Sequence, residues 1–225
     1  MTSASNPEPL AGLCRAARAL ALGLAALAGL EGCTLDTGSP GGPQRWVPEE
    51  IKVAGGAVTV RGPTGYCVDT SASRDGQKGA FVLLGSCASL QGKSSGKRPA
   101  NAAVLTAAVS SRGSDATPFR STFQAMTGFL ASKAGRTALS RNRHPDSVRI
   151  LAAVADGDVL YIHATDTAPA RGQRLEADYW RALMAVHGQI VTLTVLGLKD
   201  MPLGSEVKRA ILKNFAAAIG ARNAG

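Results

Sequence analysis

The sequence is poor in aromatic residues and in histidine. Phenylalanine, tryptophan and tyrosine together make up 4% of the chain, so few side chains are available on which nucleic-acid bases could stack. The three histidines, His144, His163 and His187, have no metal-ligand spacing with one another or with the cysteines, whereas a structural zinc site needs four ligands. We therefore expect no metal site, no cofactor and no nucleic-acid partner.

Motifs for catalysis are also missing. The one Gly-x-Ser-x-Gly match in the chain, Gly92–Gly96, falls in a loop rich in Ser, Gly and Lys rather than at a strand-to-helix turn, so no nucleophile elbow is expected. Gln91–Ser94 has the ending of a phosphate-binding loop, but Cys87 stands where that loop requires its first glycine. A mobile basic loop is the simpler interpretation of this segment.

Two groupings could still support chemistry. His163 with Asp158 or Asp166 is the best local pair for a Ser/His/Asp arrangement, because the order of such residues along a chain is free. Glu176 and Asp178 are two residues apart on an expected strand and so lie on one face, as paired carboxylates for acid–base work would. The simpler interpretations are a packed strand histidine and a solvated edge of the sheet.

A hydrophobic run long enough to span a membrane is absent as well. The most apolar stretch, residues 19–30, would extend about 18 Å as a helix, which is short of the roughly 30 Å hydrocarbon core. Arg15 and Arg18 precede it, and Leu30-Glu31-Gly32-Cys33 follows it. A cleaved export signal fits this pattern better than a spanning helix.

The four residues that end at Cys33 resemble the lipobox of bacterial lipoproteins, except that Glu31 stands where that motif prefers a small residue. The resemblance implies a signal peptide over residues 1–32 and a lipid anchor, with palmitate-type acylation, at Cys33. An ordinary secretory signal and an uncleaved anchor are the alternatives.

Export places the mature chain in the bacterial cell envelope, on the periplasmic face. No acidic residue directly follows Cys33, which by analogy with enteric bacteria favours the outer membrane over the inner one. Residues 33–48 are rich in Gly, Ser and Pro and are expected to form a flexible tether. Residues 49–222 are then left for a single domain.

Cysteine usage fits an oxidising compartment. Cys14 would leave with the signal and Cys33 would be acylated, so Cys67 and Cys87 remain as a pair. A disulfide between them would close a loop of about 20 residues and contribute roughly 3 kcal/mol. The rival interpretation, a metal site, lacks further ligands.

The chain carries a formal net charge of +9, and the expected signal contributes none of it. A basic exported protein suits a protein partner or an anionic envelope component, such as lipid head groups or wall polymers. The residues that could grip an anion fall in two clusters. These are Lys93, Lys97 and Arg98 in one loop, and Arg136, Arg141, Arg143 and Arg149 around another. Solvated, unclustered charge is the alternative.

Hydrophobic periodicity predicts strands at 57–61, 66–69, 80–85 and 102–110, then a helix from Pro118 to Gly135. Two hairpins follow, 148–164 and 179–196, in which Asp156-Gly157 and His187-Gly188 are pairs suited to type I′ turns. A helix then runs from Ser205 to Gly220, with Val207 on its apolar face and Lys208 pointing elsewhere. Residues 71–78 and 89–99 are expected to be loops. Two successive hairpins predict a four-stranded antiparallel C-terminal meander. The fold class is α+β, with two helices packed on the antiparallel sheet.

This order of elements over residues 51–220 resembles the PsbP-like fold, an α/β/α sandwich. Extrinsic proteins of photosystem II, a Ran-binding eukaryotic family and many bacterial lipoproteins share that fold. The resemblance implies a non-enzymatic binding or accessory role, since the fold hosts several such roles. An envelope hydrolase with an unrecognised site, and a purely structural lipoprotein, are the alternatives.

Overall fold

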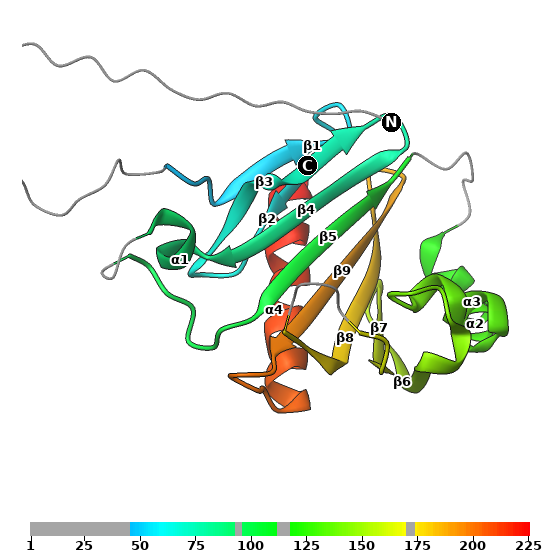
Figure 1. Cartoon of the computed structure of the whole chain (residues 1–225). Coiled ribbons are helices and arrows are strands. Elements are labelled where there is room, and N and C mark those ends of the chain that lie inside the picture. The colour runs from blue at the N-terminus through cyan, green and yellow to red at the C-terminus, as the bar shows by residue number, and fades with distance from the viewer. Residues whose placement is uncertain (1–45, 93–95, 112–117, 170–173) are drawn as a thin grey trace, which may run out of the picture. The chain divides into compact units, whose positions relative to one another are not determined.

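A seven-stranded antiparallel sheet dominates the structure (Figure 1). The computed structural model describes residues 46–92, 96–111, 118–169 and 174–225. The strand order is β3-β4-β5-β9-β8-β7-β6, and a separate hairpin joins β1 to β2. The strands are β1 Glu50–Val53, β2 Val58–Arg61, β3 Tyr66–Gly76, β4 Gly79–Ser86, β5 Val104–Ser110, β6 Val148–Asp156, β7 Val159–Asp166, β8 Leu175–Val186 and β9 Gln189–Leu198. The predicted α+β class is confirmed.

Helix α4, Ser205–Asn223, covers one face of this sheet. Side chains alternate along each strand, so every second residue of β4, β5, β8 and β9 points toward α4. Val82, Leu105, Leu193 and Phe215 are each fully buried in this main core. Figure 1 shows α4 lying behind the central strands.

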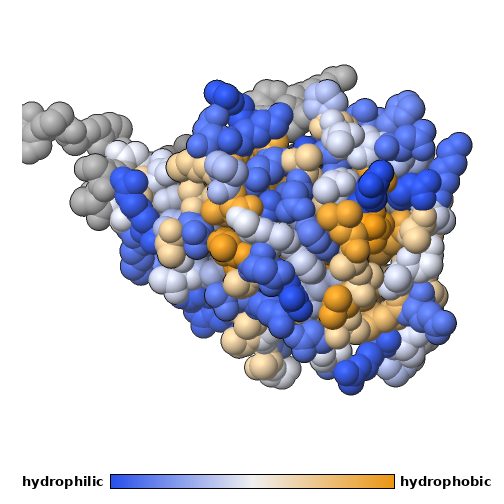
Figure 2. Space-filling view, turned by 90° about the horizontal axis from the view of Figure 1, so that it is seen from below, coloured by the Kyte–Doolittle hydropathy of each residue, from blue (hydrophilic) through white to orange (hydrophobic). Residues whose placement is uncertain are grey.

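The opposite face is covered only in part by helices α2, Phe123–Ala131, and α3, Lys133–Leu139, which contact β6. A second apolar cluster lies between these helices and β6, β7 and β8. Figure 1 places α2 and α3 at the β6 end of the sheet, away from β4 and β5. Seen from below, the surface of the molecule carries hydrophobic areas among the polar ones (Figure 2), and Phe129 of α2 is 53% exposed.

The helix expected from Pro118 is divided into a 3₁₀ turn, Phe119–Thr122, followed by α2 and α3. Ser132 separates the two helices, and its side chain accepts a hydrogen bond from the Gly135 backbone N–H. Gly135 does not end the helix as predicted. A Cβ at Gly135 would lie 2.0 Å from the Phe129 carbonyl oxygen, so glycine is needed for this close packing.

Helix α4 begins at Ser205 as predicted but runs past Gly220 to Asn223. Its buried face also differs from the predicted one. Val207 is exposed, whereas Lys208, which was expected to point elsewhere, is 1% exposed. The reason is that two carboxylates of β8 receive the Lys208 ammonium beneath the helix.

Two further segments differ from the prediction. Ser71 to Lys78, expected as a polar loop, mostly belongs to β3, an edge strand whose pairing with β4 shifts register between Asp69 and Arg74. The first residues of the loop expected from Ser89 to Pro99 belong instead to the short helix α1, Cys87–Gln91. None of the helices in the described parts of the chain has the length and apolar character needed to cross a membrane.

Candidate functional site

The face of the sheet opposite α4 carries a hollow of about 760 Å³ where α2 and α3 leave it uncovered. Strands β4, β5, β8 and β9 form its floor, and the segment after α3 forms part of its rim. A volume of this size falls in the range of roughly 300–1,000 Å³ that small-molecule sites occupy. Its apolar lining includes Phe81, Leu83, Val104, Leu175 and Leu196.

Arg181 of β8 is the most unusual residue in this hollow. Alternation along β8 places it on the same face as Tyr179, opposite to Trp180, which packs in the main core. Its Nε donates to Thr194 Oγ1 at 3.2 Å, and its guanidinium carbon lies 5.5 Å from the centre of the Tyr179 ring. Within the described residues, Arg181 forms no ion pair.

The surroundings of Arg181 disfavour its charge. Burial lowers the pKa of Arg181 from its usual value, an effect that Tyr179 and Asp166 oppose. The side chain still keeps partial solvent access through the hollow. Tyr179, whose ring lines the hollow, is 3% exposed, and its hydroxyl has no hydrogen-bond partner among the described residues.

Two further charged residues lie in the lining, Arg141 and Asp166. Asp166 is buried, and its two oxygens accept hydrogen bonds from the backbone N–H groups of Arg141 and Ala168. The Arg141 side chain donates to the Glu176 carbonyl oxygen at 2.7 Å. With Asp166 occupied by backbone donors, the described residues of the lining hold two guanidinium groups and one carboxylate, an excess of one positive charge.

A second hollow, of about 740 Å³, lies between α4 and the segments around Gly65 and Pro99. Its charged side chains and Tyr66 have partners within the protein. The Tyr66 hydroxyl donates to the Asn101 carbonyl oxygen at 2.6 Å, and burial raises the pKa of Tyr66 to about 12. Arg61 and Lys97 are both paired with Glu49. Among the described residues, every charged side chain that lines this hollow is therefore paired, in contrast to Arg181 in the first hollow.

His163 does meet a serine and a carboxylate, but in a geometry unlike a catalytic triad. Its Nε2 lies 2.5 Å from Asp178 Oδ2 and 3.2 Å from Ser205 Oγ. A triad histidine holds the carboxylate on one ring nitrogen and the serine on the other, so that the second nitrogen can take the serine proton. Here a single nitrogen faces both groups. The Ser205 hydroxyl also accepts a hydrogen bond from Trp180 Nε1 at 2.8 Å.

The same cluster continues into a buried charge pair beneath α4. Lys208 Nζ lies 2.6 Å from Asp178 Oδ1 and 3.2 Å from Glu176 Oε2. Glu176 and Asp178 share a face, as their spacing predicts, but β8 is an interior strand and neither lies on a solvated edge. His163 pairs with Asp178 rather than with Asp158 or Asp166. This cluster fastens α4 to the sheet.

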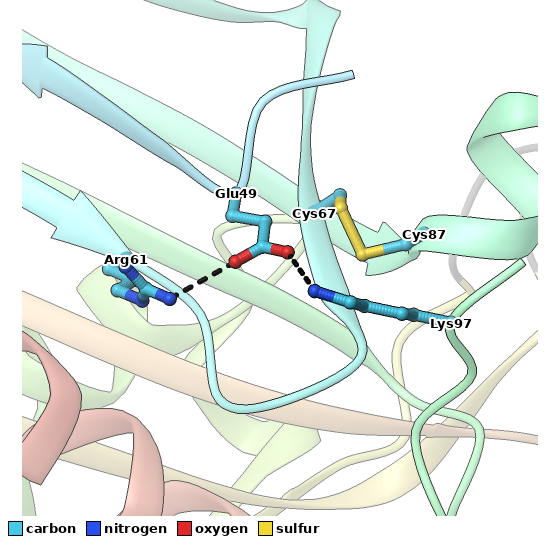
Figure 3. The surroundings of a disulfide bond; sticks show 5 residues. All are labelled: Glu49, Arg61, Cys67, Cys87 and Lys97. Carbon is cyan, nitrogen blue, oxygen red and sulfur yellow. Dashed lines mark hydrogen bonds and ion pairs between the residues drawn. A yellow bond between two sulfur atoms is a disulfide. The ribbon is translucent and has the colours of Figure 1, made fainter. Parts of the chain in front are cut away.

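The predicted disulfide is confirmed. Cys67 of β3 and Cys87 of α1 are joined, and their Cα atoms lie 4.8 Å apart (Figure 3). Beside the disulfide, Glu49 bridges Arg61 at 3.0 Å and Lys97 at 2.7 Å (Figure 3). The hydrogen bond and charge of Lys97 lower the pKa of Glu49. Lys97, one of the predicted anion-binding residues, is thus engaged with a carboxylate of the protein.

The other predicted anion-binding residues do not gather at one point. Arg136 donates to the carbonyl oxygens of Ala131 and Pro145, and only Arg141 lines the hollow. Arg143 and Arg149 are exposed, as is Arg98, which makes a contact within the protein. Lys93, Cys33, the expected signal and most of the expected tether lie outside the described residues.

Sequence reasoning missed Arg181. The available signal was a lone cation within an otherwise apolar strand, Tyr179–Val186, where alternation places it on the same face as Tyr179. Within the described ranges, no group of three or more metal-ligating side chains comes together. Comparisons with protein-family models, with curated proteins and with solved structures found no match.

Proposed function

We propose that this protein is a lipid-anchored cell-envelope protein that acts by binding rather than by catalysis. The observation that carries the proposal is the half-buried Arg181, which stands in a largely apolar hollow with no carboxylate paired to it among the described residues. A desolvated cation without a counter-ion is costly, and a ligand or partner bearing negative charge would offset that cost. The basic mature chain supports the same type of partner.

The anchor in this proposal is Cys33, with residues 1–32 as the signal peptide and 33–48 as the tether. The outer membrane is the proposed site, on the periplasmic face. Metabolic labelling with radioactive palmitate should mark the wild-type chain and not a Cys33→Ala variant. Equal labelling of both would refute the anchor.

For the fold, we propose a PsbP-like sandwich in which β6 to β9 form the four-stranded meander. The antiparallel pairing of β6 with β7, β7 with β8 and β8 with β9 supports this arrangement. Helix α4 would form one outer layer, and α2 with α3 the other.

Binding can be tested by native mass spectrometry of the full-length protein extracted from membranes. We expect a population that carries a non-covalent ligand. A Thr106→Trp variant should lose that population, because Thr106 lines the hollow and a large ring there would fill it. Ala108→Trp is the matched control, since Ala108 lies two residues along the same strand and is not among the residues that line this hollow. An unchanged ligand population in Thr106→Trp would refute the proposal.

The alternative, an envelope hydrolase, would depend on Ser205, His163 and Asp178. The shared use of His163 Nε2 by the other two residues argues against it. In a panel of ester and amide substrates we expect no turnover that is lost in Ser205→Ala. Turnover abolished by Ser205→Ala in a folded variant would favour the hydrolase instead.

A further inference from the structure

We propose that the hollow on the open face binds a monoanionic amphiphile, an organic carboxylate with an apolar body, and that Arg181 holds its carboxylate. This inference rests on the proposed binding function and names its ligand class. Three features of the hollow support this ligand: the side of the Arg181 guanidinium that carries donors without an acceptor among the described residues, the charge balance of the lining and the apolar floor.

The free edge of Arg181 suits a carboxylate. A guanidinium carries five N–H donors, and only Nε has a protein acceptor among the described residues, at Thr194 Oγ1. The two terminal nitrogens therefore remain available as a parallel pair of donors. Such a pair matches the two oxygens of a carboxylate in a bidentate contact. The cation–π contact with Tyr179 and the bond to Thr194 hold the guanidinium in place before any ligand arrives.

The balance of charge among the described lining residues indicates how many negative charges the ligand carries. Arg181 and Arg141 contribute two positive charges to the lining and Asp166 contributes one negative charge. A ligand with a single negative charge would bring this balance to zero. A ligand with two would leave an excess negative charge beside the buried Asp166 carboxylate, whose two oxygens already accept hydrogen bonds from backbone N–H groups.

The floor of the hollow indicates the chemistry of the remainder of the ligand. Phe81, Leu83 and Leu196 present apolar side chains on β4 and β9, on the strand face that does not enter the main core. Apolar surface of this kind is stabilised when a ligand removes it from water. The ligand therefore combines an anionic head with an apolar body, as aliphatic carboxylic acids do.

The test is a binding titration of the full chain in lipid nanodiscs, with empty nanodiscs as the blank. The probes are dansyl-labelled undecanoic acid and its methyl ester, which has the same body without the charge. We expect the acid to bind the wild-type protein about 10- to 100-fold more tightly than the ester, as loss of a hydrogen-bonded charge pair implies. Arg181→Met should weaken binding of the acid by a similar factor and leave binding of the ester unchanged.

Two further variants separate a loss of the site from a loss of the fold. Arg181→Lys keeps the charge without the bidentate edge, so an intermediate affinity is expected. Arg149→Met removes an exposed arginine elsewhere and should leave both affinities unchanged. Thermal unfolding of each variant checks that the sheet is intact.

Two outcomes would overturn the inference. Equal affinity for acid and ester, with no effect of Arg181→Met, would mean that the hollow binds a ligand but that Arg181 does not hold a carboxylate. Binding of neither probe, while native mass spectrometry still shows a ligand lost in Thr106→Trp, would reject the amphiphile and keep the proposed function.

Discussion

The two faces of the sheet each hold a cation in poorly solvated surroundings, and they treat it differently. On the α4 face, Lys208 is 1% exposed and is paired with two carboxylates and the Asp178 carbonyl oxygen. On the open face, Arg181 has a threonine hydroxyl and an aromatic ring but no ion pair within the described residues. Burial of a charge is therefore not by itself a sign of function in this protein, and the decisive feature is whether the protein supplies the counter-ion.

The physical reason is the cost of removing a charge from water. In a buried ion pair, mutual attraction and hydrogen bonds offset much of that cost. Removal of one partner leaves the other charge buried without compensation. An unpaired group in an open hollow keeps some water and can exchange it for a ligand. The paired cation stabilises the fold, whereas the unpaired cation remains available to bind a ligand.

Of the substitutions that test this comparison, replacement of Lys208 should lower the free energy of unfolding most. In Lys208→Ala, Glu176 and Asp178 would face each other without a cation, and the free energy of unfolding should fall by about 3–5 kcal/mol. Urea denaturation would measure the change. Lys213→Ala is the matched control, because its pair with Asp156 is exposed and should contribute less than about 1 kcal/mol. Equal losses in the two variants would contradict a structural role for Lys208.

Gly197→Ala should weaken the same cluster from the opposite strand. A Cβ at Gly197 would lie 1.5 Å from Glu176 Oε2, where the pairing of β8 with β9 shifts register. The carboxylate must then move away from Lys208, and we expect a loss of about 1–3 kcal/mol. Gly220→Ala, with no heavy atom within 4 Å of its Cβ, should be neutral or stabilise α4 by up to about 1 kcal/mol. A Gly197→Ala variant as stable as Gly220→Ala would show that the cluster tolerates displacement.

Acid should weaken the α4 face. Burial raises the pKa of Asp178, but the hydrogen bonds and charges of Lys208 and His163 outweigh it, so the pKa is lowered overall. A lowered pKa in the folded state contributes stability that is present above the unfolded value of about 3.9 and is lost as the pH falls through the folded value. Denaturation between neutral pH and about pH 3 should show this decline, and Asp178→Asn should flatten it. An equally steep decline in Asp178→Asn would place the titrating group elsewhere.

Arg181→Met should have the smallest effect on stability and can have the opposite sign. It removes an unpaired cation from the hollow at the loss of one hydrogen bond and one cation–π contact. We expect the free energy of unfolding to change by no more than about 1 kcal/mol, or to rise. A loss as large as that of Lys208→Ala would mean that Arg181 supports the fold and would remove the contrast between the faces.

Much of the fold could be predicted from the sequence because it depends on local patterns. Alternating strands between 148 and 196 and the apolar spacing before Phe215 are short-range signals, and the structure has strands and α4 there. The conformations of the two hairpin turns followed less closely from the local sequence. Of Gly157 and Asp158 only the glycine has a positive φ, so the type I′ turn predicted at Asp156-Gly157 is wrong. His187 and Gly188 both have positive φ, as a type I′ turn requires.

By itself, the sequence determined the α+β class, the antiparallel character of the sheet and the bond between Cys67 and Cys87, because these depend on residue pattern and on the few cysteines present. Only the tertiary structure decided which cation is paired. Lys208 and Arg181 are 27 positions apart in the chain, and their surroundings come from α4, β8, β9 and the segment after α3. A counter-ion is a property of three-dimensional proximity, so no local pattern could show that one cation has it and the other does not.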